Sequence, residues 1–265
     1  MTTHSITKTP ADDLDDMICA YRQSLEAPLD GMWQHFTRAA EHYAIKKGPE
    51  LVGYCAVDAE NRLLQLSLVE GVNARQVFED MLEDLKPLGA VLASFETAAL
   101  ALALDQQRSV AVNAFLYALQ QGTAKGAPLF PKGAVFEKLE KADLEDAVAF
   151  AYGALGADEA WLRGYLADLI QKGELYGLRL DGDIVATGEC RVSETQKPFA
   201  DVGMVVGPSY RGQGIATNIL RALIAVCKSK GLEPICSTER ANIAAQKAIE
   251  RAGFTSRHRM LEIEF

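Results

Sequence analysis

The chain has 265 residues, of which 49% are hydrophobic and 24% are charged, and its formal net charge at pH 7 is −9. This composition is typical of a soluble chain that forms one large or two small domains, and the acidic balance argues against a broad nucleic-acid-binding surface. No N-terminal segment has the pattern of a signal peptide, and the most apolar run, at residues 98–104, is far shorter than the roughly 20 residues that cross a bilayer.

The first half of the chain carries a pattern that the second half repeats. Each half contains one of the two tryptophans, in a predicted helix that precedes a strand. Residues 43–53 align with residues 176–186 at an offset of 133, and residues 92–97 align with residues 235–240 at an offset of 143. We therefore expect a tandem duplication, with two unrelated α/β halves as the alternative.

A short stretch near the middle of the chain breaks both helix and strand. Its glycine and proline residues are Gly122, Gly126, Pro128, Pro131 and Gly133. Such punctuation is typical of a linker. We expect a first domain at residues 1–121, a linker at 122–133 and a second domain at 134–265.

The second half alternates predicted strands and helices. We expect strands near 134–140, 175–180, 184–192, 200–206, 234–238 and 254–264, and helices near 143–155, 158–172, 214–230 and 241–252. The Asp181-Gly182-Asp183 sequence predicts a tight turn between the second and third of these strands. Helices interspersed among the strands of one sheet indicate an α/β (α+β) fold.

A glycine-rich turn between the predicted strand at 200–206 and the helix at 214–230 is the most informative feature of the chain. The N-terminus of a helix offers unpaired N–H groups and a partial positive charge, which suit a phosphate. Gly212 and Gly214 let the backbone approach an anion closely, and Arg211 adds a cation. The turn therefore predicts a pyrophosphate-binding site, and the first half lacks its counterpart.

Two common phosphate-binding motifs do not fit this turn. A Walker loop needs Lys and Ser or Thr where Gln213 and Gly214 stand. A dinucleotide-binding fingerprint needs Gly or Ala where Thr217 stands. An NTPase and a dinucleotide-dependent enzyme are both disfavoured.

Arg211, Gly214 and Ala216 form the pattern Arg-x-x-Gly-x-Ala, which resembles the pyrophosphate loop of the GNAT superfamily of N-acetyltransferases. Asn242 after the next strand and the Gly-Phe pair that ends the next helix agree with this resemblance. It covers nearly all of residues 134–265. It implies two tandem GNAT-like domains, each with a mixed, mostly antiparallel central sheet flanked by helices, of which the first is degenerate.

The resemblance implies transfer of an acetyl group from acetyl-CoA to a primary amine by direct attack in a ternary complex. The strand before the turn is expected to pair with the pantetheine arm, the loop amides to bind the pyrophosphate, and the asparagine to contact the cofactor near its thiol. These residues are Met204, Val205, Val206, Arg211, Gly212, Gln213, Gly214, Ile215, Ala216, Thr217 and Asn242. The strand residues can equally be plain core, and Asn242 can equally cap its helix.

An amine with a pKa of about 10.4 is protonated at neutral pH, so the attack needs a proton acceptor. Many GNAT enzymes place an acid about ten residues before the first residue of the loop motif, and Asp201 holds that position here. Glu239, at the exit of the following strand, is the second candidate. Glu189 is the third, because a hairpin glutamate is usually on the surface.

The family often carries a tyrosine that protonates the leaving thiolate, and Ile249 stands at that position. Ser237, Thr238 and water stay open as proton donors. The expected function is an N-acetyltransferase acting on a small-molecule amine. The alternatives are an acyl-CoA sensor or pseudoenzyme, and a protein (lysine or N-terminal) acetyltransferase.

The remaining expectations concern partners and location. The five cysteines are scattered and form no C-x-x-C pair, which favours reduced thiols, a cytoplasmic location and no metal site. We expect one acetyl-CoA per chain, a small-molecule amine as acceptor, and neither nucleic acid nor membrane as partner. A homodimer is compatible with the sequence.

Overall fold

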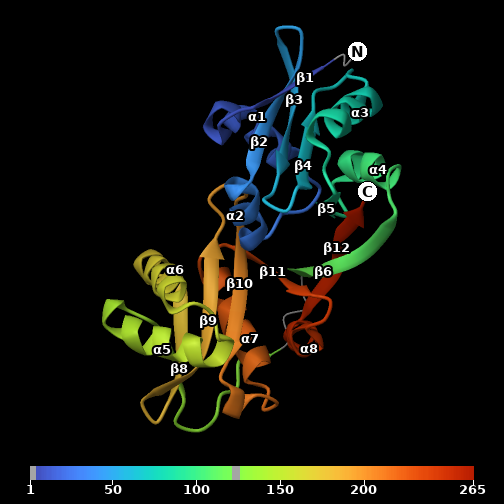
Figure 1. The fold of residues 1–265 in the computed structure, drawn as a ribbon. Helices are drawn as coiled ribbons and strands as arrows, with labels where there is room; N and C mark the ends of the chain where they lie inside the picture. The colour runs from blue at the N-terminus through green and yellow to red at the C-terminus, as the bar shows by residue number, and fades with distance from the viewer. Residues whose placement is uncertain (1–3, 121–125) are drawn as a thin grey trace. The chain divides into compact units, whose positions relative to one another are not determined.

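The computed structural model describes residues 4–120 and 126–265, and the chain divides into two compact units (Figure 1). Unit 1 comprises Met1–Leu116 with His258–Phe265, and unit 2 comprises Tyr117–Arg257. The last strand of the chain therefore begins in unit 2 and ends in unit 1. Residues 122–125 of the expected linker lie outside the described residues, and the expected domain boundaries stay a prediction.

Unit 1 is built from strands of one sheet and the helices that connect them. Its strands are β1 (Ser5–Lys8), β2 (Glu41–Lys47), β3 (Glu50–Val57), β4 (Arg62–Leu68), β5 (Gly89–Ala93), most of β6 (Ser109–Leu119) and the end of β12 (Phe254–Glu264). Its helices are η1 (Ala11–Leu14), α1 (Asp15–Ser24), α2 (Gly31–Ala39), α3 (Ala74–Leu85) and α4 (Thr97–Leu104). Strands β1 to β4 pair antiparallel in chain order, β5 joins β4 in parallel, and β12 pairs antiparallel with β5.

The sheet of unit 1 is buried on both faces. Successive side chains of a strand point to opposite faces, and neighbouring leucines of β4 accordingly join two different clusters. Leu63 packs in a cluster with Phe78 of α3, whereas Leu64 packs in a cluster with Leu29. All of these side chains are buried, so β4 is a core strand.

Unit 2 has its own run of strands with helices on both sides. Its strands are β7 (Val135–Lys138), β8 (Leu175–Leu180), β9 (Asp183–Val192), β10 (Phe199–Val206) and β11 (Glu233–Glu239). Its helices are η2 (Lys141–Asp143), α5 (Leu144–Leu155), α6 (Glu159–Lys172), η3 (Pro208–Tyr210), α7 (Ile215–Ser229) and α8 (Ile243–Ala252). Pairing is antiparallel from β7 to β10, and β11 joins β10 in parallel. The expected mixed, mostly antiparallel α/β (α+β) fold is confirmed.

The β8–β9 hairpin has the tight turn that its sequence predicts. Asp181 and Gly182 both have positive φ, 53° and 96°, as a type I′ turn requires at its two central residues. The Asp-Gly pair thereby starts the pairing of β8 with β9, whose register shifts once between Leu178 and Arg179 before it reaches Glu189.

Helix α7 packs closely on one face of β9. A Cβ added to Gly188 would lie 2.8 Å from Ile219 and 3.2 Å from Leu223, so the absence of a side chain lets the helix approach the strand. Both α7 side chains are fully buried, and such burial stabilises the fold by roughly 1.5–3 kcal/mol for each side chain. The neighbouring residue Glu189 points to the opposite face, where its carboxylate meets Tyr165 of α6.

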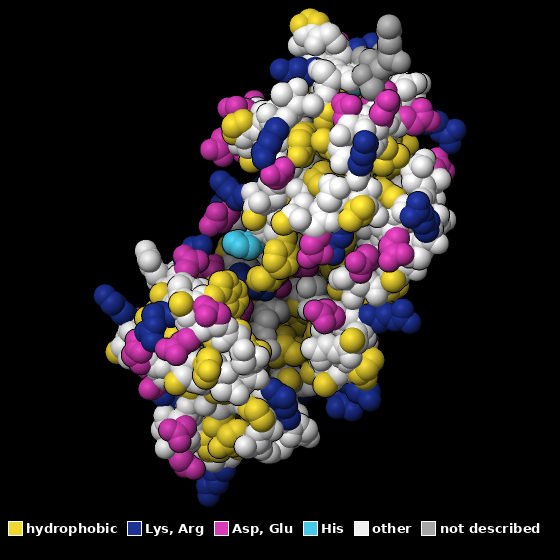
Figure 2. Space-filling model, in the orientation of Figure 1, with side chains coloured by type: hydrophobic (Ala, Val, Ile, Leu, Met, Phe, Trp, Pro, Cys, Tyr) yellow, Lys and Arg dark blue, Asp and Glu magenta, His cyan; other side chains and the backbone are white. Residues whose placement is uncertain are grey.

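The surface mixes charges of both signs. On the face that Figure 2 draws, acidic and basic side chains are interspersed, in keeping with 36 acidic and 27 basic residues. Within residues 4–120 and 126–265, no helix is long and apolar enough to cross a membrane, and no group of three or more His, Cys, Asp or Glu side chains is placed to hold a metal ion.

Candidate active site

Strands β10 and β11 separate part-way along their length. β10 pairs with β9 over residues 200–206, but its pairing with β11 stops, in the described part of the chain, at Asp201 opposite Ile235. β10 continues to Val206 and β11 continues to Glu239. One backbone edge of β10 is therefore left facing a gap.

The direction of the backbone N–H and C=O groups shows which residues of β10 face this gap. Gly207 donates its N–H to Val185 on the β9 side at 3.0 Å. Because successive residues of a strand point their backbone groups to alternate edges, those of Val206 and Met204 face the gap. Arg211 Nε donates to the Val206 carbonyl at 3.1 Å. The N–H and C=O of Met204 remain at an edge that an extended ligand segment can join like an added strand.

The glycine-rich turn leaves the N-terminus of α7 open. Gly212 and Gly214 have φ of 77° and 79°, and a Cβ on either would meet nothing within 4 Å. Helix α7 has no side-chain cap, and from Gly212 to Thr217 no backbone N–H donates a hydrogen bond within the described chain. Asn218 is the first residue of the helix whose N–H is bonded, to Gly214 at 3.2 Å. Unpaired N–H groups at a helix N-terminus form a natural anion site.

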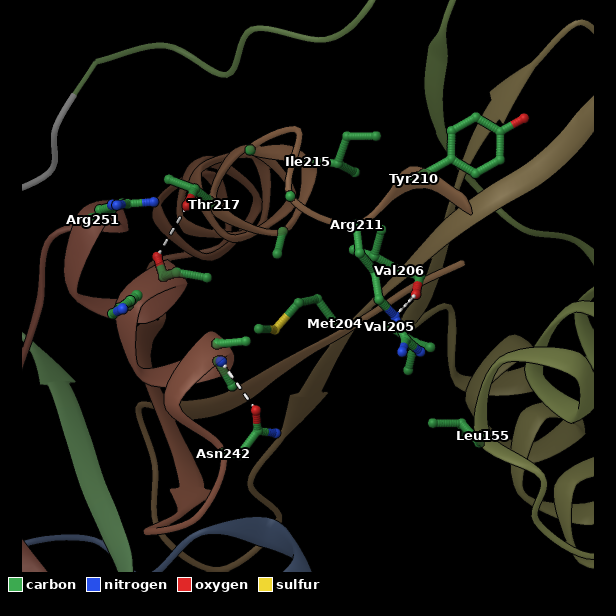
Figure 3. A pocket seen from close by; sticks show the side chains of 17 residues that line it. Leu155, Met204, Val205, Val206, Tyr210, Arg211, Ile215, Thr217, Asn242 and Arg251 are labelled. Carbon is green, nitrogen blue, oxygen red and sulfur yellow. Dashed lines mark hydrogen bonds between the residues drawn. The ribbon is translucent and has the colours of Figure 1, made fainter. Parts of the chain in front are cut away.

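A cavity of about 520 Å³ joins the open helix end to the free strand edge (Figure 3). Ten of the eleven residues expected to bind the cofactor line it; Gln213 does not, and its side chain instead donates to the Ser209 carbonyl at 3.3 Å. The sequence motif has therefore been folded into one concave site. The roles of the individual residues stay predictions.

Arg211 supports the shape of the turn. Besides its bond to Val206, its guanidinium donates to the Ala154 carbonyl at the end of α5, at 3.2 Å. The sequence had suggested only a cation for phosphate. Lys247 and Arg251, one turn apart on α8, also line the cavity. Sequence reasoning did not consider these two cations. Their four-residue spacing, on the helix that follows Asn242, places them on the same face of that helix.

Asn242 caps α8. Its Oδ1 accepts the N–H of Ala245 at 3.1 Å, and its side chain also lines the cavity (Figure 3). Capping is one of the two roles that the sequence left open, and it leaves the amide NH₂ group of the side chain for a ligand. A cofactor contact by Asn242 stays a prediction.

Comparison with known proteins supports the resemblance. Residues 10–120 match the family described as "Acetyltransferase (GNAT) domain", and residues 139–254 match "Acetyltransferase (GNAT) family". A solved acetyltransferase from the GNAT family of Colwellia psychrerythraea is 35% identical, with a TM-score of 0.92, over 98% of this chain and 99% of that chain. The chain belongs to the GNAT acetyltransferase family.

More distant structures share the fold of this GNAT protein. A GCN5-related N-acetyltransferase from Sphaerobacter thermophilus has a TM-score of 0.65 at 15% identity, covering 99% of this chain and 95% of that chain. A tandem GNAT protein from the clavulanic acid biosynthesis pathway has a TM-score of 0.68 at 15% identity, covering 98% and 97%. A search of functionally curated proteins finds no significant match. The expected tandem of GNAT domains is confirmed.

The first GNAT domain has no open helix end at the corresponding place. Asn73 precedes α3 and accepts the N–H of Gln76 at 3.3 Å. Arg75 is paired with Asp105 at 2.9 Å. The side-chain cap takes the place of the glycine turn, which accords with a degenerate first copy.

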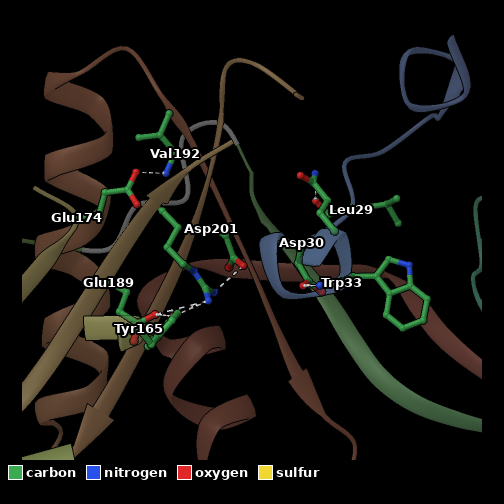
Figure 4. Close-up of polar contacts among 10 residues, drawn as sticks. Leu29, Asp30, Trp33, Tyr165, Glu174, Glu189, Val192 and Asp201 are labelled. Carbon is green, nitrogen blue, oxygen red and sulfur yellow. Dashed lines mark hydrogen bonds and ion pairs between the residues drawn. The ribbon is translucent and has the colours of Figure 1, made fainter. Parts of the chain in front are cut away.

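The two expected catalytic carboxylates lie apart in this GNAT fold. Asp201 is buried on β10, and Arg191 Nη2 donates to it at 2.7 Å (Figure 4). Glu239 is exposed at the end of β11, four residues beyond the Ile235 position that pairs with Asp201, or roughly 13 Å along the strand. Their roles stay predictions, and the ion pair of Asp201 disfavours it as a free proton acceptor.

Arg191 stays charged in this setting. Burial disfavours its cationic form, but the carboxylates of Asp201 and Glu189 outweigh burial and raise its pKa. Its Nη1 donates to the Tyr165 hydroxyl at 2.9 Å, and Tyr165 in turn donates to Glu189 at 2.6 Å. Sequence reasoning missed both Arg191 and Tyr165, because neither belongs to the motif.

The position at which the family often carries a proton-donating tyrosine holds a core residue in this chain. Ile249 has 2% of its surface exposed and is part of the core, so that position of the GNAT fold supplies no proton. Tyr210 lines the cavity, but in Figure 3 its hydroxyl points away from Met204 and Asn242.

Proposed function

We propose that the second GNAT domain binds acetyl-CoA in the cavity beside α7 and transfers the acetyl group to a primary amine of a small molecule. The observation that carries this proposal is the run of unpaired N–H groups from Gly212 to Thr217 at an uncapped helix N-terminus. Such a site suits a diphosphate. Acyltransfer is the activity of the family to which the chain belongs.

Further features of the cavity support this proposal. The free edge at Met204 can pair with the amide groups of a pantetheine arm, and the space before Gly212 and Gly214 is open. Lys247 and Arg251 add positive charge along the cavity wall, which favours a ligand that carries several phosphates. When bound, acetyl-CoA supplies the thioester carbon that the amine attacks.

The reaction needs two proton transfers. The acceptor ammonium first loses a proton to a base of the protein, and its nitrogen lone pair then attacks the thioester carbon. The C–S bond breaks as the amide forms, and the second proton of the nitrogen neutralises the departing thiolate. Since a simple thiol has a pKa of about 8.5, this leaving group does not require a strong acid.

A sensor of acyl-CoA is the second candidate, because the buried Ile249 removes the usual proton donor. Free-thiol release from acetyl-CoA in the presence of a panel of small amines separates the two functions. The transferase releases thiol in proportion to amide formed, as measured by mass spectrometry. Tight binding of acetyl-CoA by calorimetry with no thiol released for any amine would identify a sensor. Thiol released with a pool of basic peptides but not with small amines would indicate a protein acetyltransferase.

A further inference from the structure

A polar network crosses β9 and β10 beneath α6 (Figure 4). Arg191 Nη2 lies 2.7 Å from Asp201 Oδ2, Arg191 Nη1 lies 2.9 Å from the Tyr165 hydroxyl, and that hydroxyl lies 2.6 Å from Glu189 Oε2. The network therefore contains two carboxylates and one guanidinium. With both carboxylates ionised, it carries one negative charge that has no counterpart within it.

Glu189 is the more weakly paired of the two carboxylates. Arg191 is 2.7 Å from Asp201 but 3.6 Å from Glu189, so its charge is committed mainly to Asp201. The Asp201 side chain is 6% exposed, and that of Glu189 is 14% exposed. A partly buried carboxylate whose closest partner is a neutral hydroxyl attracts a cation from solvent.

Glu189 also lies next to the proposed path of the cosubstrate. It is paired across the sheet with Gly203, and a Cβ added to Gly203 would lie 3.6 Å from Glu189 Oε2. The Glu189 carboxylate thus lies over Gly203, which has no side chain. Gly203 immediately precedes Met204, whose backbone edge faces the gap between β10 and β11.

An aromatic surface adjoins this carboxylate. The Trp161 ring stacks on the Tyr165 ring with centroids 5.1 Å apart and an angle of 9° between the planes. Trp161 is 51% exposed, which leaves its ring available to a ligand. A flat face beside a negative charge suits a cation attached to a planar body.

We propose that Glu189, Tyr165 and Trp161 form the acceptor site, and that it takes a small primary ammonium carrying an aromatic ring. Glu189 binds the ammonium, and the Trp161–Tyr165 stack binds the ring. Arg191 and Asp201 are positioning residues that hold the Tyr165 hydroxyl toward Glu189. This inference rests on the proposed function, since it names the acceptor of the same domain.

Binding can be measured without turnover. The chain has two tryptophans, so a Trp33→Phe variant leaves Trp161 as the single indole reporter. We expect 2-phenylethylammonium and benzylammonium, added to this variant in the presence of CoA, to quench its fluorescence with saturation. In that background Glu189→Gln should weaken binding about 10- to 100-fold, the loss typical of a charged hydrogen bond. Glu194→Gln, which removes the same charge from a side chain that is 79% exposed, should leave binding unchanged.

The readouts separate this inference from the function on which it rests. Saturable quenching that Glu189→Gln weakens, with no thiol released for any amine, would refute the transferase and leave Glu189, Tyr165 and Trp161 as a binding site for an aromatic ammonium rather than an acceptor site. Thiol release with aliphatic amines only, and no saturable quenching by either aromatic ammonium, would overturn the acceptor site and leave the transferase intact. Equal affinity in Glu189→Gln and its parent would also overturn it. For an active enzyme, Glu189→Gln should lower kcat/KM for 2-phenylethylamine but spare aniline, whose nitrogen is neutral at pH 7.

Discussion

The two GNAT domains differ most clearly at one helix N-terminus. In the second domain α7 follows Gly214, has no side-chain cap and leaves its first N–H groups unpaired. In the first domain α3 follows Asn73, whose side chain accepts the N–H of Gln76. The comparison shows that a capping side chain stabilises a helix end by occupying the groups that an anion would need.

The strands before these helices, and the acids at the ends of the strands after them, differ in the same sense. Residues 63–66 of β4 are buried, whereas residues 203–206 of β10 are partly exposed. Glu96 follows β5 and is buried against the Tyr21 hydroxyl, whereas Glu239 at the end of β11 is exposed. In the first domain, protein side chains therefore bury the region that stays exposed in the second domain.

The largest effect should come from a bulky side chain in the turn. Gly214→Leu places a side chain where open space and free N–H groups now meet, and we expect it to weaken acetyl-CoA binding more than 100-fold in calorimetry. Gly71→Leu is the control, because Gly71 has a similar φ of 82° and equally open surroundings in the first domain. An unchanged affinity in Gly214→Leu, or an equal loss in both variants, would refute the role of the turn.

Removing the partner of Arg191 should destabilise the second domain. Asp201→Asn leaves a guanidinium that is 19% exposed without its closest carboxylate, and we expect the free energy of unfolding to fall by about 3 kcal/mol. Denaturant titration checks this, with the exposed Glu239→Gln as a control that should have little effect. If Asp201 were also the base, the variant would lose rate more at neutral than at high pH, whereas an equal loss at every pH would exclude that role.

Glu96 should make the first domain sensitive to pH. Burial raises its pKa from 4.5 to about 7, against the opposing hydrogen bonds from Tyr21 and the Ala93 N–H. Because the folded-state pKa is raised, the folded chain holds the proton more tightly, and stability is lost as pH rises from 4.5 to 7. Over this window the free energy of unfolding of the unmodified chain should fall by about 3 kcal/mol relative to that of Glu96→Gln. Parallel stability curves for the two proteins would contradict this.

The smallest effect concerns the cap in the first domain. Asn73→Ala removes the acceptor for Gln76 and should lower the free energy of unfolding by about 1 kcal/mol. It should not create a second cofactor site, because the glycine turn is still absent and residues 63–66 of the corresponding strand are buried. Calorimetry should give one acetyl-CoA per chain before and after the change. A stoichiometry of two for either protein would contradict the assignment of a degenerate copy.

Local sequence predicted the features that depend on local geometry. The turn at Gly212 and Gly214 needs positive φ, the Asp181-Gly182 pair fixes a hairpin, and Asn242 is a common capping residue, so each followed from a few neighbouring residues. The expected helix at 214–230 is α7 at Ile215–Ser229. Such features carry their signal within one or two turns of chain.

Contacts between distant segments left no such signal. The pairing of Arg191 with Asp201 depends on the register of β9 against β10, and the bond from Tyr165 to Glu189 depends on how α6 packs on the sheet. Hydrophobic periodicity likewise does not say which strand will be a neighbour, so the pairing of β12 with β5 could not be predicted. The turn was therefore predictable, whereas the network around the candidate base was not.

The most direct test is an amide-resolved NMR titration of the full chain with acetyl-CoA. The backbone N–H signals of residues 212–217 should shift and become protected from exchange with solvent, while those of the capped turn at residues 73–76 stay unchanged. If acetyl-CoA binds but the signals of residues 212–217 do not respond, the uncapped end of α7 is not its diphosphate site.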